Sequence, residues 1–262
     1  MTAIPFPYLS PVIDVTLSGK AVAPLTARFG VTSDLRGQAD TCVLMVADKA
    51  NELEQTVERG DPLVIRWGYG GGELTEIFRG VVRRPAPAKA GVGVDGQVVV
   101  LGVDYNTILN SRRVRVTFED ETASGVIRAL TADTGLGLEV EECRLEIDRL
   151  PLFDQTLRQA IDAVTDLVRR EAGEEYFDYI RGGVFHWRRK DYDQAPVQAF
   201  KTGVDIIRLE RLGDGLSFLE TLVTPVHHSE VVEVDGERCF VVKTAHLWES
   251  GGRTRIWFED AG

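Results

Sequence analysis

The sequence predicts a mainly β protein with an α+β insert, built as two β-barrel domains separated by a small region of helices and a hairpin. Three observations predict this class. The first ~110 residues alternate short apolar segments with breaks rich in Gly, Pro and Asp, as expected of strands recurring every ~8–12 residues. The apolar period then lengthens to that of amphipathic helices in the middle of the chain. The β pattern resumes after residue 204.

A length of 262 residues fits two modest domains. The segments we expect are an N-terminal extended arm at 1–11, a first β-barrel at 12–113, an α+β insert of two helices and a hairpin at 114–200, and a second, smaller β-barrel at 201–262. The arm contains Pro5, Pro7 and Pro11 but neither Lys nor Arg, so it lacks the pattern of a signal peptide. No apolar run approaches the ~18 residues that span a bilayer.

The first barrel is predicted from short runs of β-forming residues between turn signals. The strands are expected at residues 12–17, 27–31, 41–47, 63–69, 74–83 and 97–103. The charged interval 51–59 is compatible with one helical turn. Residues 68–72 are rich in glycine and predict a tight hairpin that pairs the two strands on either side of it.

The insert is predicted from helical periodicity. Residues 122–134 place Val126, Ile127 and Leu130 on one face, and Gly135 follows as a stop. A stronger helix is expected at 156–172, where apolar residues recur at helical spacing, Thr156 and Gln159 have the spacing of a capping box, and Gly173 ends the helix. A small hairpin should follow, formed by strands 176–180 and 184–188 around Arg181-Gly182-Gly183.

The second barrel is predicted from a further set of short strands. These are expected at 205–209, 218–223, 230–234, 238–246 and 253–258. Asp235-Gly236 supplies the two positive-φ positions of a tight hairpin turn, and Ser250-Gly251-Gly252 closes another.

The composition argues against several classes of partner. The formal charge of −11 has the wrong sign for holding phosphates, so we expect no sequence-specific nucleic-acid binding and no membrane partner. The negative charge is typical of a surface that resists aggregation, and a negative channel past which DNA slides is the alternative. Cys42, Cys143 and Cys239 have no metal-ligand spacing and indicate reduced thiols in a cytosolic folding compartment.

No motif predicts a cofactor or a metal. The glycines Gly91, Gly93 and Gly96 match a dinucleotide-binding string, but they lead into a predicted strand rather than the helix N-terminus that a pyrophosphate requires. The adjacent His227 and His228 should point to opposite faces of a strand. The other two histidines, His186 and His246, complete no zinc spacing.

No motif predicts catalysis either. The serines Ser10, Ser18, Ser33, Ser111, Ser124, Ser217, Ser229 and Ser250 fall in breaks or at helix starts, and none lies in a nucleophile motif. The acid pairs Asp48/Glu52 and Glu141/Glu142 are of the kind that chance supplies among 41 carboxylates. We therefore predict a protein that is not an enzyme, with no catalytic, cofactor or metal residues and with undefined binding residues.

Three motifs of the first predicted barrel carry a family resemblance. They are Gly60-Asp61-Pro62-Leu63-Val64-Ile65-Arg66-Trp67-Gly68, Ile77-Phe78-Arg79-Gly80-Val81-Val82 and Leu101-Gly102-Val103-Asp104-Tyr105. The pattern continues in Asn106 to Arg113, the helix from Glu121 through Gly135-Leu136, the helix at 154–173, the Gly182-Gly183 hairpin and the closing Cys239–His246 segment. Together they resemble the late control D and baseplate-hub family of phage tail proteins, over most of residues 12–258.

The resemblance implies a structural protein. Members form a trimer in which each subunit contributes two related barrels, making a pseudo-sixfold ring that joins the tail tube to a spike or tail tip. The partners implied are two further copies of the chain, a tail-tube or distal tail protein, a spike or tail-tip protein and other baseplate proteins. The implied location is the virion tail or baseplate of a phage-like particle assembled in the bacterial cytoplasm. Such a ring would use up exposed sheet edges.

Two other functions stay open at this point. One is a carbohydrate-binding or cell-wall-degrading β protein, motivated by aromatic residues such as Trp67 and Tyr69, which look exposed, and by the many carboxylates. The other is a distal tail or receptor-binding adaptor in the same kind of particle. The sequence does not distinguish a contractile from a non-contractile tail, or a phage from a gene-transfer particle or an injection system. It also leaves open the interface residues, the identity of the spike, and whether the trimer precedes assembly.

Overall fold

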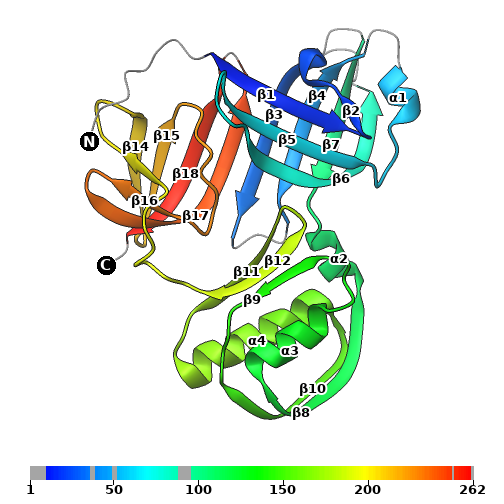
Figure 1. Ribbon diagram of the computed structural model, residues 1–262, viewed down its shortest axis with the longest axis vertical. Coiled ribbons are helices and arrows are strands. Elements are labelled where there is room, and N and C mark those ends of the chain that lie inside the picture. The colour runs from blue at the N-terminus through cyan, green and yellow to red at the C-terminus, as the bar shows by residue number, and fades with distance from the viewer. Residues whose placement is uncertain (1–9, 36–38, 49–51, 88–95, 250, 261–262) are drawn as a thin grey trace. The chain divides into compact units, whose positions relative to one another are not determined.

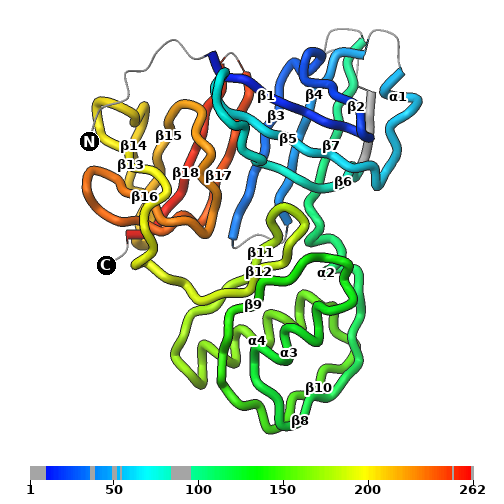
Figure 2. Tube along the Cα trace, viewed as in Figure 1, coloured from blue at the N-terminus to red at the C-terminus, as the bar shows by residue number. Residues whose placement is uncertain are grey.

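The structure is a computed structural model that describes residues 10–35, 39–48, 52–87, 96–249 and 251–260 (Figure 1). The chain forms two compact units. The sheet unit comprises Met1–Val103 and Gln194–Gly262, and the insert unit comprises Asp104–Asp193. Figure 2 follows the chain from the first segment of the sheet unit into the insert unit and back again.

The sheet unit is built on one large sheet, which has 13 strands within the described residues. Its strand order is β14-β15-β18-β17-β3-β4-β7-β6-β5-β1-β2, with β16 added to β17 and β13 added to β16. The N-terminal strands are β1 (Pro11–Leu17), β2 (Lys20–Ala21), β3 (Thr26–Asp34), β4 (Thr41–Ala47), β5 (Pro62–Tyr69), β6 (Thr75–Pro87) and β7 (Gln97–Val103). The C-terminal strands are β13 (Gln198–Phe200), β14 (Ile206–Gly213), β15 (Leu216–Thr221), β16 (Val231–Val234), β17 (Glu237–Trp248) and β18 (Arg253–Asp260).

Two short helices, η1 (Ala23–Leu25) and α1 (Glu52–Thr56), lie between the N-terminal strands. The two groups of strands are joined by β17, which pairs antiparallel with β3 from Lys243↔Asp34 to Trp248↔Phe29. The strands that the sequence assigned to separate barrels are therefore hydrogen-bonded into one sheet. Figure 1 shows β1, β5 and β6 crossing in front of β3, β4 and β7, so the N-terminal half of the sheet folds over onto itself.

Each half of the sheet encloses its own apolar core. The N-terminal core includes Leu17, Leu44, Leu63, Ile65 and Trp67, and the C-terminal core includes Phe200, Leu219, Val241, Ile256 and Phe258. Packing in the N-terminal half is close enough to require a glycine. A Cβ built on Gly102 would lie 2.8 Å from Leu63 Cδ2 and 3.1 Å from Phe78 Cε1.

The insert unit packs helices against two small sheets. Its elements are α2 (Asn106–Ser111), β8 (Arg113–Thr122), α3 (Ala123–Thr131), β9 (Gly137–Val140), β10 (Glu146–Thr156), α4 (Leu157–Ala172), β11 (Tyr176–Arg181) and β12 (Val184–Arg189). β8 and β10 form a two-stranded antiparallel ribbon. β11 and β12 form a hairpin, which β9 joins in parallel beside β12. The core lies between these sheets and the apolar faces of α3 and α4.

Helix α4 begins and ends at the signals in its sequence. The Thr156 hydroxyl accepts a hydrogen bond from Gln159 N at 3.2 Å, and the Gln159 side chain accepts one from Thr156 N at 2.9 Å. These two bonds satisfy backbone donors that have no partner within the helix. Gly173 follows the helix with a φ of +69°, a left-handed conformation that favours glycine.

A buried polar network ties three elements of the insert unit together. Arg158 of α4 donates to Asp178 of β11 and to the side-chain oxygen of Asn106 of α2, both at 2.6 Å. Burial raises the pKa of the Asp178 carboxyl, and the adjacent Arg158 guanidinium opposes that rise. Trp187 Nε1 donates to Thr165 Oγ1 at 3.0 Å, which satisfies the polar atom of a fully buried indole.

The mainly β class with an α+β insert is confirmed. Each strand expected from the sequence overlaps an observed strand, and the helices expected at 122–134 and 156–172 correspond to α3 and α4. Asp235 and Gly236 have φ values of +51° and +94° at the turn between β16 and β17. The sequence did not predict the ribbon of β8 and β10, the parallel strand β9 or helix α2.

The observed units and the expected segments have different limits. The insert unit spans residues 104–193, whereas the insert was expected at 114–200. Most of the expected arm at 1–11 and of the glycine string at 91–96 lies outside the described residues. Among the helices described, none is long and apolar enough to cross a membrane.

The capping box of α4 gives a first prediction. Thr156→Ala removes the acceptor for Gln159 N, so we expect it to lower the free energy of unfolding of the insert unit by ~1 kcal/mol. Gln159→Glu is the matched control, because glutamate retains the reciprocal bond to Thr156 N. Denaturant unfolding followed by far-UV circular dichroism measures both variants. Equal losses in the two variants would contradict a role for the threonine cap.

Candidate assembly surface

Strand β14 is one end of the large sheet. It pairs antiparallel with β15 and, among the described residues, with no other named strand. Its register with β15 shifts twice, between Ile206 and Arg208 and between Arg211 and Gly213. Bulges of this kind bend an edge strand and limit uncontrolled pairing. The edge nevertheless offers backbone groups to which another strand can bond.

The side chains of β14 leave part of the C-terminal core uncovered. Leu209 lies directly opposite Leu219 of β15. Leu219 is fully buried, whereas Leu209 is 42% exposed. Since directly opposite residues project from the same face of a sheet, the apolar layer that buries Leu219 continues to the open edge at Leu209. Ile207 and Leu212 on the same strand are each 51% exposed.

More apolar side chains are exposed near this edge. Val204, just before β14, is 66% exposed, and Leu222, just after β15, is 43% exposed. Large apolar residues gathered at a strand edge differ from apolar residues scattered over a surface, because together they stabilise contact with a partner. We define the edge surface as β14 together with Val204 and Leu222.

The opposite face of this half of the sheet is charged and largely self-paired. Arg255 lies 2.7 Å from Glu220, Lys243 lies 3.0 Å from Asp34, and Arg208 forms an ion pair with Glu210. The Arg208 guanidinium also lies 5.7 Å from the centroid of the Phe218 ring. These pairs satisfy one another's charge, and the rings of Phe218 and Trp257 lie on the same face with centroids 5.1 Å apart.

The other end of the sheet is formed by β1 and β2. β1 pairs with β5 over its full length, but β2 pairs only with Thr16 and Leu17. The free part of β1 includes Val12, which is 37% exposed, and Asp14, whose carboxylate lies 3.1 Å from Arg66. The two ends of the sheet therefore differ in sequence and charge. Contact between unlike ends is a heterologous contact, the kind that generates rings.

The four histidines do not converge on one site. His246 is fully buried and packs edge-on against Trp67, with ring centroids 4.8 Å apart. Burial lowers its pKa to about 3, an effect that a hydrogen bond with the Val226 backbone opposes. His186 stacks on Tyr179 and lies 3.0 Å from Glu139. Within the described ranges, no group of three or more potential ligands is placed to hold a metal ion.

His228 and Ser33 come close to one carboxylate without forming a nucleophile and its base. The Ser33 hydroxyl donates to Asp40 Oδ2 at 2.6 Å, and His228 Nε2 lies 3.9 Å from the same oxygen. A serine nucleophile requires its proton to be taken by the imidazole, whereas here the hydroxyl points to the carboxylate. His227 N donates to Glu230 Oε2 at 2.9 Å. These contacts hold the loop before β16 in place.

The carboxylate pairs have structural partners. Asp48 Oδ1 accepts from Glu52 N at 2.9 Å and so caps α1. Glu142 lies 2.8 Å from Arg128, which lowers the pKa of the Glu142 carboxyl. Glu141 accepts from Arg189 N at 3.0 Å. The three cysteines are buried, and burial raises the pKa of the Cys239 thiol to about 12, so it stays protonated at neutral pH.

Trp67, which motivated the carbohydrate-binding alternative, is buried. Its ring has no solvent exposure and lies in the N-terminal core beside Phe29, with ring centroids 6.0 Å apart. Tyr69 is half-buried against the same core. Trp67 points inward because alternate residues of β5 face the core, and Leu63 and Ile65 share its face.

The sequence did not reveal the edge surface. It predicted a strand at 205–209 but gave no sign that this strand ends the sheet. The weak signal available was the irregular spacing of Ile206, Ile207, Leu209 and Leu212, which is not the strict alternation of a strand with one buried face.

Several solved structures have a fold similar to that of this chain. The tail protein from Neisseria meningitidis MC58 is similar, with a TM-score of 0.74 at 12% identity and 97% of each chain covered. The 43 kDa tail protein of prophage MuSo2 from Shewanella oneidensis has a TM-score of 0.72 at 11% identity, with 95% of this chain and 96% of that chain covered. No protein-family model and no curated protein matches the sequence.

A third similar structure belongs to a secretion system. It is an E. coli component of the type VI secretion system, itself described as structurally similar to tail proteins of bacteriophage T4. Its TM-score is 0.63 at 7% identity, with 95% of this chain and 77% of that chain covered. The chain therefore has the fold of phage tail proteins and of their counterparts in type VI secretion.

The contrast between Leu209 and Leu219 gives a second prediction. Leu219→Ala opens a cavity in the C-terminal core and should lower the free energy of unfolding of the sheet unit by ~2–5 kcal/mol. Leu209→Ala, at the directly opposite position, should cost less than ~1 kcal/mol. Denaturant unfolding of both variants measures the difference. Similar large losses would show that Leu209 stabilises the monomer instead of remaining free for a partner.

The buried imidazole gives a third prediction. Between a pH of about 3 and 6.5 the unfolded chain binds a proton at His246 that the folded chain does not. The free energy of unfolding should therefore fall as the pH drops through this window, by ~1.4 kcal/mol per pH unit. His246→Gln, which has no titrating group, should reduce this dependence by about one proton. Urea unfolding at several pH values measures it, and equal slopes in the two proteins would contradict it.

Proposed function

We propose that this chain is a structural tail protein of a phage-like particle, a hub that joins the tail tube to the central spike or tail tip. The observation that carries the proposal is the open, apolar edge surface on a sheet whose fold is shared with proteins described as tail proteins. In the monomer, the exposed leucines of β14 stay in contact with water, which is unfavourable. A partner that covers this surface removes apolar area from water and satisfies backbone groups.

The proposed state in the particle is a homotrimer. Each subunit contributes two half-sheets with separate cores, so three copies present six similar lobes around a ring. The unlike ends of the sheet, β14 and β1, meet head to tail between neighbouring copies. Such a ring matches a sixfold tube on one side and a threefold spike on the other. The proposed partners are a tail-tube or distal tail protein, a spike or tail-tip protein and other baseplate proteins.

The proposed work is done by surfaces, without catalysis. The carboxylate pairs that might have served a glycosidase form a helix cap and structural bonds. Trp67, the aromatic residue that favoured carbohydrate binding, is buried. These observations support the hub over a sugar-cleaving protein. We propose the tail or baseplate of the particle as its location, after assembly in the bacterial cytoplasm.

The edge surface gives a fourth prediction. Leu209→Lys places a charge where a neighbouring copy would contact the edge, so we expect it to reduce incorporation into tails at least ~tenfold. Leu138→Lys on β9 is the matched control, because Leu138 is similarly exposed but lies in the insert unit. Co-purification from cells that also express the tail-tube and spike proteins measures incorporation.

Electron microscopy of the purified assemblies tests the symmetry. Threefold rings with two lobes per subunit support the hub. Rings located only at a receptor-binding tip, without contact to the tube, would favour the distal adaptor. A monomer that binds glycans and neither partner protein would overturn the proposal, as would normal tails formed by Leu209→Lys.

A further inference from the structure

The ribbon of the insert unit has an edge that the proposed hub does not use. β8 pairs with β10 from Arg113↔Thr156 to Thr122↔Glu146 and, within the part of the chain that the structure describes, with no other strand. A two-stranded ribbon has a free edge on each strand, and such edges accept a further strand through backbone hydrogen bonds. β8 is ten residues long, which gives this edge considerable length.

The two faces of β8 differ in character. Val114, Val116 and Phe118 are half-buried and pack against the core of the insert unit. Arg113, Arg115, Thr117 and Glu119 alternate with them and are exposed. These exposed side chains therefore lie along β8 next to its free edge. Their charges determine which strand can pair with β8 there.

The charges in this row are ordered along the strand. Arg113 and Arg115 lie on one side of Thr117, and Glu119 lies on the other, followed by Asp120 and Glu121. In antiparallel strands, directly opposite residues share a face and lie within reach of each other. A second β8 running in the opposite direction, with Thr117 opposite Thr117, places each Arg115 opposite Glu119 of the other copy. The strand is complementary in charge to itself.

We propose that β8 pairs antiparallel with β8 of a second copy of this chain, in the register centred on Thr117. The contact is isologous, since each copy contributes the same residues, and it closes at two copies. It depends on the ribbon alone and does not rest on the proposed hub function.

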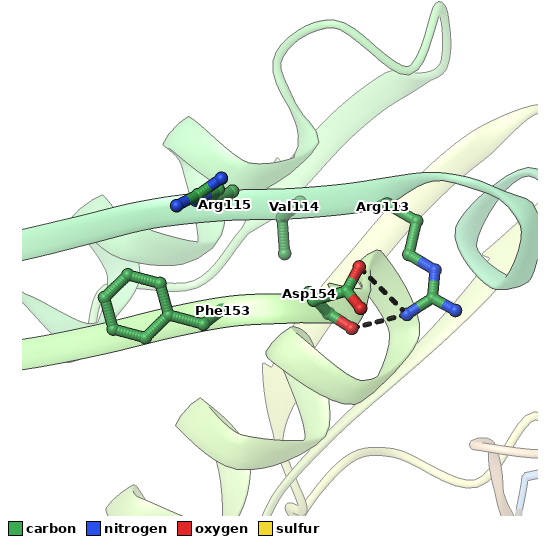
Figure 3. A pocket seen from close by; sticks show the side chains of 5 residues that line it. All are labelled: Arg113, Val114, Arg115, Phe153 and Asp154. Carbon is green, nitrogen blue, oxygen red and sulfur yellow. Dashed lines mark hydrogen bonds and ion pairs between the residues drawn. The ribbon is translucent and has the colours of Figure 1, made fainter.

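The surroundings of Arg115 fit this contact (Figure 3). Arg113 is held by the backbone carbonyl of Asp154 and lies 3.3 Å from Asp154 Oδ1. Arg115 makes no such ion pair among the described residues and lies opposite Phe153 of β10, whose side chain is 61% exposed. These residues line an open depression of about 430 Å³ with Val114 and Asp154. Phe153 therefore offers apolar area beside the free arginine.

Glu119 is also able to pair with Arg115 of the second copy. Among the described residues it forms an ion pair with Arg149 at 3.6 Å, and the two side chains are 65% and 72% exposed. An ion pair so exposed is weak and is easily exchanged for a partner across a strand pair. Both members of the proposed intermolecular pair, Arg115 and Glu119, are therefore free to form it.

Charge exchange gives the fifth prediction. Arg115→Glu or Glu119→Arg alone places like charges opposite each other twice in the dimer, so we expect each to weaken self-association at least ~tenfold. The double variant Arg115→Glu/Glu119→Arg restores the complementarity and should associate like the wild type. Sedimentation equilibrium measures the dissociation constants, in a Leu209→Lys background that suppresses contact through the edge surface. A double variant as weak as the single variants overturns the register.

A cross-link tests the same register independently. Opposite residues in an antiparallel pair have Cα atoms ~4.5–5.5 Å apart, a separation that a disulfide spans. Thr117→Cys should therefore form a covalent dimer on mild oxidation, and the three native cysteines are buried. Pro151→Cys, opposite Thr117 on β10, is the control and should not. A cross-link through residue 151 instead of 117 overturns the proposal, and so does a protein that stays monomeric and forms no cross-link at 117.

Discussion

The pairing of β17 with β3 determines what the rest of the sheet unit becomes. It joins residues 29–34 to residues 243–248 and merges two groups of strands into one sheet. The Lys243–Asp34 ion pair lies at one end of this junction, and the stacked rings of Phe29 and Trp248 lie at the other, with centroids 6.2 Å apart. Without the junction, each half would be a small sheet over a small core.

The same junction also produces a long sheet with open edges. Within the described residues, the main path of the sheet ends at β14 and at β1 with β2, and β13 forms a further edge on the branch through β16. β14 ends the path with exposed leucines, whereas β1 ends it with a strand whose Val15 and Leu17 are buried and which β2 covers only in part. An edge strand can be protected from pairing or used for it, and in the proposed hub the bulges and apolar side chains of β14 would limit its pairing to a defined partner.

Local signals in the sequence were enough to locate most elements. The Thr156 and Gln159 pair marked the start of α4, and Asp235-Gly236 marked a hairpin, because these residues act on backbone within a few positions of themselves. The ribbon was missed because a helix and a strand lie between β8 and β10 in the sequence. No short turn motif therefore marks the two strands as a pair. The partners that bury Trp67 could not be named from the sequence, because packing across β5 depends on residues distant in sequence.

The candidate surface required the topology. Leu209 and Leu219 are the same residue type in neighbouring strands, and only the strand order makes one of them core and the other edge. Pairing between copies is less visible still, because a single sequence does not record which edges meet. The charge order of β8 was present in the sequence from the start, but it gained meaning only when the strand proved to have a free edge.

The discontinuous sheet unit also has a consequence for synthesis on the ribosome. The insert unit is one continuous segment, so all of its contacts are available once residue 193 has emerged. β3 emerges early, but its partner β17 follows only after about two hundred further residues. Closing so long a loop is slow compared with local folding. The insert unit is therefore expected to have folded while the edge of β3 that pairs with β17 is still free. The growing chain therefore passes through a stage in which an early strand, β3, exposes the edge that β17 will later cover.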